Sequence, residues 1–210
     1  MKKILIATNN SGKFEEIAIL LKALDIQAVS PSYLNLVEPE EDALNFADNA
    51  FIKAKFYGDK AQMIALADDS GLCVVDLDNA PSIHSARFAI DSQGNKNFNW
   101  AFEKIFHQLA QKSILPIHQP EAYFVCNLCL YNPLNNLRIN FEGRVDGYLT
   151  YPPLGNKGFG YDPIFIKHGM GETFGQIDPK IKHQISHRAQ AFLQLENWLK
   201  GNYNIFDSSN

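Results

Sequence analysis

Two adjacent carboxylates, Asp68 and Asp69, stand between two short apolar runs, Ile64–Ala67 and Leu72–Val75. Runs this short, bounded by turn residues, are typical of buried strands, so the pair is expected where one strand ends and another begins. Adjacent carboxylates are costly in a core unless a cation or hydrogen bonds compensate them. The pair could therefore hold a cation. The alternative is a plain turn in which Ser70 satisfies a backbone group.

A small polar loop, Thr8–Lys13, joins the first expected strand, Lys3–Ala7, to the first expected helix. Apolar residues at helical spacing form one face of that helix: Phe14, Ile17, Ala18, Leu21 and Leu24. Asn10 or Ser11 can cap its N-terminus, where outward amides and the helix dipole favour a phosphate. Lys13 lies in the first turn of this helix, where a cation opposes the helix dipole unless an anion lies beside it. A capped helix start without a ligand is the alternative, and the Walker A spacing is missing.

A second group of carboxylates, within Glu38–Asp42, lies at the expected start of the second helix. Acidic residues at a helix start suit the helix dipole, which explains them without a ligand. Asn45, Asn49 and Lys53 recur every four residues and share one polar stripe. Such a stripe is usually solvated. It could also present an amide and an ammonium to a phosphate.

The stretch Gly155–Pro163 holds three glycines, two aromatic rings and one carboxylate. Glycine lets the backbone approach a ligand, and an aromatic ring can stack on a flat base, although ordinary turn chemistry explains single glycines. Near the C-terminus, Lys182–Arg188 is expected to open a helix. Its residues His183 and His187 are four apart, but no third ligand completes a zinc site.

Composition fits one soluble domain, or one domain with two lobes, since 46% of the 210 residues are hydrophobic and 20% are charged. A net charge of −4 argues against a nucleic-acid-binding module. No apolar run approaches the roughly 18–20 residues of a membrane span, and Ile4–Ala7 is too short for a signal peptide, which predicts a cytoplasmic protein. Cys126 and Cys129 are expected in one strand, on opposite faces and buried, because no second pair completes a zinc site.

The remaining elements follow from periodicity and breakers. Val29–Pro39 and Asn79–Arg87 are expected as loops. A helix is expected from Phe98 to Leu109. Three strands should follow: Ala122–Tyr131, Leu137–Glu142 and Arg144–Thr150, the last two separated by Gly143.

Six motifs together resemble one family, the inosine triphosphate pyrophosphatases, also called dITP/XTP pyrophosphatases, over about residues 1–199. The motifs occur in this order: Thr8-Asn9-Asn10 with Lys13; Asn49-Ala50 with Lys53-Ala54; Ala67-Asp68-Asp69-Ser70-Gly71-Leu72; Ser85-Ala86-Arg87; Gly158-Phe159-Gly160-Tyr161-Asp162-Pro163; and Ser186-His187-Arg188. The resemblance implies an α/β fold with a long mixed sheet flanked by helices, and two lobes with the site in a cleft between them. Residues 1–200 would form this single two-lobed domain, and residues 201–210 a polar tail.

The resemblance also implies an activity: Mg²⁺-dependent hydrolysis of ITP, dITP and XTP to the monophosphate and pyrophosphate, by a homodimer, which removes these nucleotides from the pool. Glu41 and Asp69 would hold Mg²⁺. Glu40 could take the place of Glu41, and Asp68 that of Asp69. Asp69 would accept the proton of the attacking water. The substrate-binding residues would be Thr8, Asn9, Asn10, Ser11, Gly12, Lys13, Lys53, Ser70, Phe159, Gly160, Tyr161, Asp162, Lys182, His187 and Arg188.

Two of these substrate-binding residues could distinguish one purine base from another. Arg188 can only donate hydrogen bonds and an ionised Asp162 can only accept them, which matches O6 and N1–H of a 6-oxopurine and mismatches adenine. Three positions depart from the family pattern: Asn9 and Ser82 stand where the family commonly has glycine, and His84 stands where it has tyrosine. A non-catalytic nucleotide-binding protein is the competing function, but it would need no acid pair.

Overall fold

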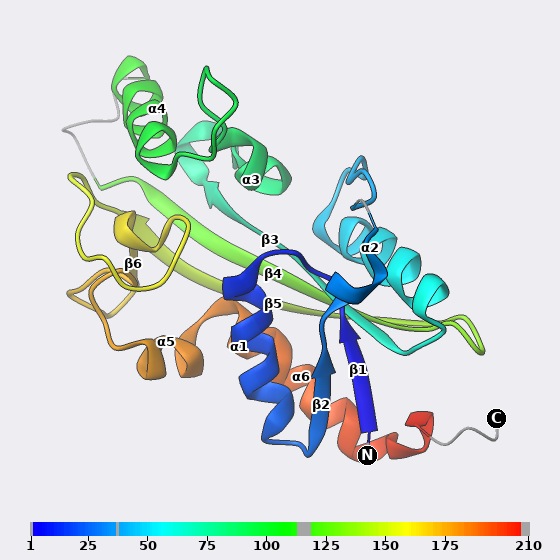
Figure 1. Cartoon of the computed structure of the whole chain (residues 1–210). Helices are drawn as coiled ribbons and strands as arrows, with labels where there is room; N and C mark the ends of the chain where they lie inside the picture. The colour runs from blue at the N-terminus through cyan, green and yellow to red at the C-terminus, as the bar shows by residue number, and fades with distance from the viewer. Residues whose placement is uncertain (1, 37, 113–118, 207–210) are drawn as a thin grey trace. The chain divides into compact units, whose positions relative to one another are not determined.

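The computed structural model describes residues 2–36, 38–112 and 119–206 of the chain (Figure 1). Its strands are β1 (Lys2–Ile6), β2 (Ile26–Val29), β3 (Ala65–Val74), β4 (Glu121–Asn132), β5 (Leu137–Leu149) and β6 (Phe165–Lys167). Its α-helices are α1 (Ser11–Lys22), α2 (Phe46–Ala61), α3 (Ser85–Phe88), α4 (Phe98–Gln111), α5 (Pro179–Ile185) and α6 (His187–Gly201). Short 3₁₀ turns lie between them.

The six strands form one mixed sheet in the order β2-β1-β3-β4-β5-β6. β1 pairs in parallel with β2, where Lys2 faces Ile26, and with β3, where Leu5 faces Ala65. β5 and β6 pair antiparallel, with Leu149 facing Phe165. The predicted α/β class and the mixed sheet flanked by helices are confirmed. β2 and β6 are strands that the sequence did not predict.

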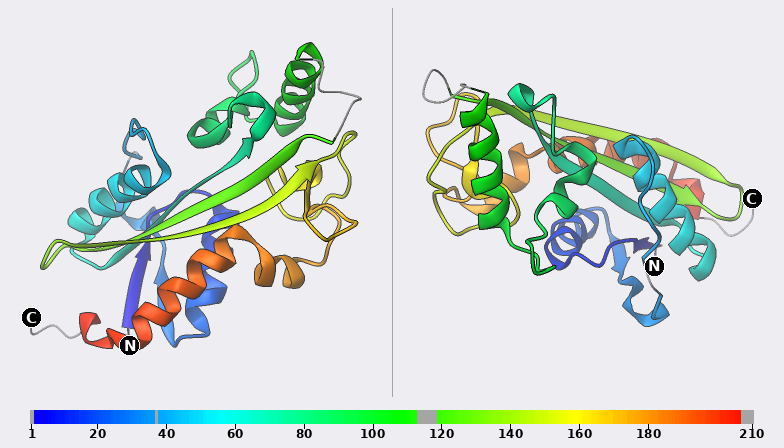
Figure 2. Two further views of the ribbon diagram at one scale, coloured as in Figure 1. Left: turned by 180° about the vertical axis from the view of Figure 1, so that it is seen from behind. Right: turned by 90° about the horizontal axis from the view of Figure 1, so that it is seen from above.

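Contacts divide the chain into two units. Unit 1 comprises residues 1–69, 126–143 and 188–210. Within it, each face of the sheet carries a core. Successive side chains of β1 point to opposite faces and so enter different cores. Ile4 and Ile6 pack in the core shared with α1 and α6, whereas Leu5 and Ala7 pack in the core shared with α2. The two views in Figure 2 show α2 on one face of these strands and α1 with α6 on the other.

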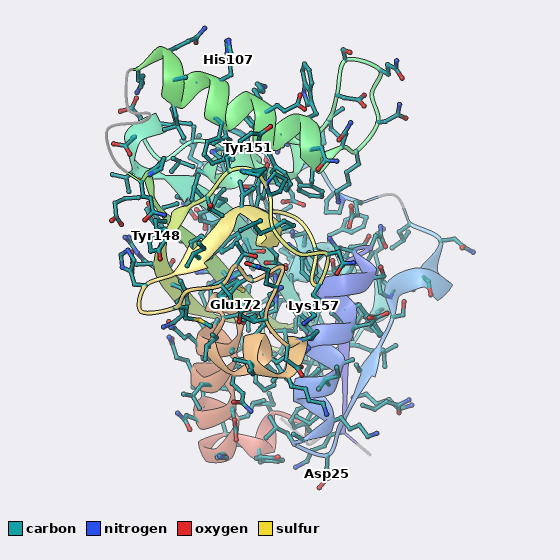
Figure 3. All side chains as sticks on the ribbon, turned by 90° about the vertical axis from the view of Figure 1, so that its left-hand side faces the viewer. Asp25, His107, Tyr148, Tyr151, Lys157 and Glu172 are labelled. Atoms are coloured by element: carbon teal, nitrogen blue, oxygen red, sulfur yellow. The ribbon has the colours of Figure 1, made fainter. Side chains whose placement is uncertain are left out.

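Unit 2 comprises residues 70–125 and 144–187 and has one core. The apolar face of α4 packs there as its periodicity predicted, with Phe102, Ile105 and Leu109 buried. Tyr151, labelled in Figure 3, places its ring 4.8 Å from that of Phe106 on α4. The ring contact joins α4 to the segment that follows β5.

Five local predictions are wrong. The segment Asn79–Arg87, expected as a loop, contains a 3₁₀ turn at Ser82–His84 and enters helix α3 at Ser85. β3 runs without a break through Asp68 and Asp69, since burial on both faces keeps this strand extended past Gly71. Gly143 likewise does not interrupt β5. Helix α2 begins only at Phe46, so the preceding carboxylates lie outside it and the dipole explanation for them fails. The C-terminal helix is two helices, separated at the extended Ser186, which removes the expected helical spacing of His183 and His187.

The cysteine prediction is confirmed: Cys73, Cys126 and Cys129 are free and buried, and Cys126 and Cys129 lie in different cores. Past α6, the residues up to 206 form a 3₁₀ turn, and the Lys2 ammonium lies 3.2 Å from the centre of the Tyr203 ring. Residues 207–210 of the predicted tail are outside the described residues. Among the residues described, no helix is both long and apolar enough to span a bilayer.

Candidate active site

Asp69 lies on the α2 side of β3 with a buried lysine. The Lys53 ammonium is 3.1 Å from Glu41 Oε1 and 3.8 Å from Asp69 Oδ1. Burial raises the pKa of Asp69 to about 6, and the nearby Glu41 and Asp68 add to this while Lys53 and Lys13 oppose it. Although burial lowers the pKa of Lys53, the carboxylates around it raise that pKa overall. One buried ammonium thus holds two carboxylates together.

Asp68 points to the other face of β3, as consecutive strand residues must. Its Oδ2 accepts hydrogen bonds from Arg188 Nη2 at 3.0 Å and Nε at 3.3 Å, and from the Cys126 thiol at 3.2 Å. The Lys13 ammonium forms an ion pair with Oδ1. Burial would raise the pKa of Asp68, but Arg188, Lys13 and Lys53 outweigh it and hold that pKa well below its ordinary value.

This cluster answers two questions that the sequence left open. The anion beside Lys13 in the first turn of α1 is Asp68, so a bound phosphate is not required to explain that lysine. Both oxygens of Asp68 face cationic donors, and Asp69 lies near the Lys53 ammonium that also contacts Glu41. Glu40, the other exchange considered, is exposed. Glu41 and Asp69 thus lie beside one ammonium on the α2 side of β3, whereas Asp68 lies on the opposite face of that strand.

Glu16 and Cys126 belong to this site and were missed from the sequence. Glu16 is buried and forms an ion pair with Arg188 Nη1. The available signal was its spacing, because Glu16 follows Lys13 by three residues and so shares its face of α1. No local signal links Cys126 to Asp68, since 58 residues separate them.

The loop between β1 and α1 is built by short-range hydrogen bonds. The Asn10 N–H donates to Thr8 Oγ1, and Asn10 Oδ1 caps α1 by accepting from the Lys13 N–H, both at 3.2 Å. Asn10 is thus the cap, and Ser11 and Gly12 form the first turn. Asn9 does not adopt a left-handed backbone, so its replacement of the family's glycine adds no strain.

In unit 2, Asp162 organises the glycine-rich loop. It is buried, and its Oδ2 accepts from the Phe159 N–H at 2.8 Å and from the Lys182 ammonium at 2.6 Å. That ammonium lies 4.5 Å from the centre of the half-buried Phe159 ring. Gly158 has φ +72°, and a Cβ there would lie 2.1 Å from Asp162 Oδ2, so only glycine fits. Phe159, Asp162 and Lys182 thus form one compact cluster.

The other predicted site residues of unit 2 have different surroundings. The Tyr161 hydroxyl donates to the Ser85 carbonyl at 2.8 Å, and its ring packs on Phe98, so its contacts are those of a core residue. The preceding Gly160 has φ +67°, and Ser70 is half-buried. His187 is buried and stacks on Phe124 with 4.7 Å between ring centres. The roles expected for these four residues stay predictions.

The carboxylates near Lys53 form a small donor set for a cation. Among the described residues, no group of three or more His, Cys, Asp or Glu side chains converges on one point. Mg²⁺, however, is commonly bound through one or two carboxylates, with substrate phosphates and water completing the octahedron. Glu41 and Asp69, held on one ammonium, fit such an ion.

Known proteins match this chain over most of its length. The Ham1 family model matches residues 4–198. A dITP/XTP pyrophosphatase from Zymomonas mobilis is 44% identical over 193 residues, which are 92% of this chain and 90% of that protein. One from Rhizobium meliloti is 39% identical over 199 residues, 91% of this chain and 92% of that protein.

Solved structures extend the similarity to the fold. A HAM1 protein from Coxiella burnetii superposes with a TM-score of 0.83 at 32% identity, covering 96% of this chain and 100% of that one. A Ham1 protein from Staphylococcus aureus gives 0.82 at 32% identity, covering 95% and 99%. The sequence and structural matches both span nearly the whole chain. This chain belongs to the Ham1 family.

Proposed function

We propose that this chain is a Mg²⁺-dependent pyrophosphatase that hydrolyses ITP, dITP and XTP to the monophosphate and pyrophosphate. The observation that carries the proposal is the pair of carboxylates, Glu41 and Asp69, gathered around the Lys53 ammonium. A protein that only binds nucleotides needs phosphate-binding cations, but it has no use for an acid pair beside them. The names of the relatives support the substrate class.

The residues of unit 1 would perform the reaction on the triphosphate. Bound Mg²⁺ would supply charge neutralisation at the phosphates and make a bound water more acidic. Glu41 and Asp69 would hold that ion. Asp69 would accept the proton of the attacking water; an aspartate is ordinarily a weak base, and the greater acidity of a metal-bound water would compensate for that. Lys53 and Lys13 would stabilise negative charge on the leaving pyrophosphate.

The residues of unit 2 would read the base. Phe159 offers a half-buried ring on which a base can stack, and Asp162 places an acceptor beside the Lys182 donor. That pair matches N1–H and O6 of hypoxanthine and xanthine, and adenine would leave both groups mismatched. Arg188 was expected to supply the O6 donor, but its guanidinium contacts Asp68 and Glu16. Lys182 is therefore the better candidate, and Arg188 remains the alternative.

The test compares ITP, XTP, GTP and ATP as substrates with Mg²⁺, for wild type and Lys182→Gln. We expect pyrophosphate release, a preference for ITP and XTP over ATP, and a smaller preference in the variant. In well-built sites, unsatisfied buried polar groups discriminate by roughly 10⁴-fold. Nucleotide binding without pyrophosphate release would instead identify a non-catalytic binding protein.

Assembly and location complete the proposal. A homodimer in the cytoplasm is expected from the family resemblance. Light scattering at micromolar concentration should give twice the chain mass of 23.7 kDa. A mass equal to one chain would contradict the dimer without touching the activity.

A further inference from the structure

Asn49 is a fully buried side chain on α2, one helical turn before Lys53. Side chains four residues apart on a helix are neighbours. Asn49 Oδ1 accepts a hydrogen bond from the Ala43 N–H at 3.0 Å, while Lys53 contacts Glu41. Two successive turns of α2 therefore contact the segment that precedes the helix, one through a hydrogen bond and one through an ion pair.

That segment, residues 38–45, has no helix or strand of its own. At its other end the Asn9 N–H donates to Glu38 Oε1 at 3.2 Å. Glu41 lies between these two contacts. The contact at Glu38 is exposed, whereas the one at Ala43 ends on a buried amide, so Asn49 is the better shielded anchor.

We propose that Asn49 is a positioning residue for the metal site: its amide oxygen fixes Ala43 and thereby holds Glu41 beside Lys53 and Asp69. The inference rests on the proposed function, in which Glu41 and Asp69 bind the metal. A mispositioned carboxylate cannot bind an ion that demands near-ideal octahedral geometry. Residues that orient metal ligands typically change metal affinity 10–100-fold when they are replaced.

The chemistry of the amide fits this role. An aspartate at this position could accept the same hydrogen bond, but it would add a carboxylate to a buried group that already holds two. Asparagine supplies an acceptor without charge. Its Nδ2 makes no hydrogen bond with any residue that the structure describes, so the amide oxygen is the atom that the fold uses.

Three variants separate positioning from simple destabilisation. Asn49→Leu keeps the side-chain size and removes the acceptor, whereas Asn49→Asp keeps the acceptor. Asn45→Ala is the matched control at the same helix end, because Asn45 caps α2 by accepting from the Asp48 N–H at 2.8 Å and its side-chain amide also bonds to Asp48. Removing that cap costs about 1 kcal/mol of helix stability.

Two measurements use no catalysis: hydrogen exchange of the Ala43 amide by NMR, and the Mn²⁺ dissociation constant from the electron paramagnetic resonance signal of free Mn²⁺. In Asn49→Leu we expect faster Ala43 exchange and Mn²⁺ binding weakened by about 10–100-fold. In Asn49→Asp, exchange should stay slow and Mn²⁺ should bind at least as tightly as to wild type, because negative charge is added. Asn45→Ala should keep the wild-type Mn²⁺ affinity.

Wild-type Mn²⁺ affinity in Asn49→Leu, despite fast Ala43 exchange, would overturn the proposal, as would equal weakening in Asn45→Ala. Fast exchange of Ala43 in wild type would remove its basis. Wild type that binds Mn²⁺ no better than Glu41→Gln would overturn it together with the proposed metal site. If only the proposed activity is wrong, pyrophosphate release will be absent. The differences in Mn²⁺ affinity and Ala43 exchange between the variants will remain, so the two failures can be told apart.

Discussion

Replacing Arg188 by methionine removes the central cation of the buried cluster in unit 1. The guanidinium is 2% exposed, and it contacts Asp68 Oδ2 through two nitrogens and Glu16 through the third. Loss of one partner from a buried ion pair typically destabilises a protein by about 3–5 kcal/mol, because it leaves uncompensated charge. For a chain of this size, about 2–4 °C per kcal/mol predicts a fall in melting temperature of about 6–20 °C.

A surface pair in the same unit is the control. Arg138 Nη2 lies 2.6 Å from Asp48 Oδ1, and both side chains are at least one-third exposed. Exposed pairs contribute about 0–1 kcal/mol, so Arg138→Met should be nearly neutral. Urea unfolding of both variants provides the comparison. If Arg188→Met loses less than about 1 kcal/mol, like its control, the assignment of a buried charge network is refuted.

The pH dependence of Arg188→Met carries a sign that follows from Asp68. Its pKa is depressed in the folded protein, so the stabilisation is present above the unfolded value of about 3.9 and is lost as pH falls through the depressed pKa. In the variant the pKa of Asp68 is less depressed. The loss in free energy of unfolding relative to wild type should therefore be full at pH 7 and become smaller in acid. Substrate choice gives a second readout: equal losses of rate on ITP and ATP would show that Arg188 does not read the base.

Three further predictions concern single positions. Asp69→Asn should lower turnover by far more than tenfold while nucleotide still binds, because an amide is neither a base nor a good Mg²⁺ ligand; steady-state kinetics within tenfold of wild type would exclude the role. Metal-free wild type should lose up to roughly 3 kcal/mol as pH rises from about 4 to 6, since a raised carboxyl pKa makes ionisation unfavourable in the folded state; denaturation of Asp69→Asn should lack this slope. Ser82 has φ +51°, so Ser82→Gly should relieve left-handed strain and raise the melting temperature by about 1–4 °C; a lower melting temperature would show that the serine hydroxyl matters more.

The sequence was informative wherever a local pattern decides the structure. The spacing of apolar residues predicted α1 and α4, and the alternation of side chains predicted that Cys126 and Cys129 lie on opposite faces. The family motifs located the candidate site residues. The glycine position now held by Ser82 was recognised as a departure, and its left-handed backbone explains why glycine is common there.

The partners of the charged residues could not be predicted, because they depend on contacts between distant segments. Asp68 and Asp69 are neighbours in sequence and face different helices in the fold. Arg188 reaches Asp68 across 120 residues, and that contact gives it a use other than the expected one at the base. The break between α5 and α6 was also missed, since the apolar stripe continues past Ser186.

The central claim is that water attacks the α-phosphorus of a deaminated purine triphosphate. Its most direct test is hydrolysis of ITP with Mg²⁺ in ¹⁸O-labelled water, followed by mass spectrometry of the products. We predict IMP carrying one ¹⁸O and unlabelled pyrophosphate. Label in the pyrophosphate, or products that are IDP and orthophosphate, would contradict the account.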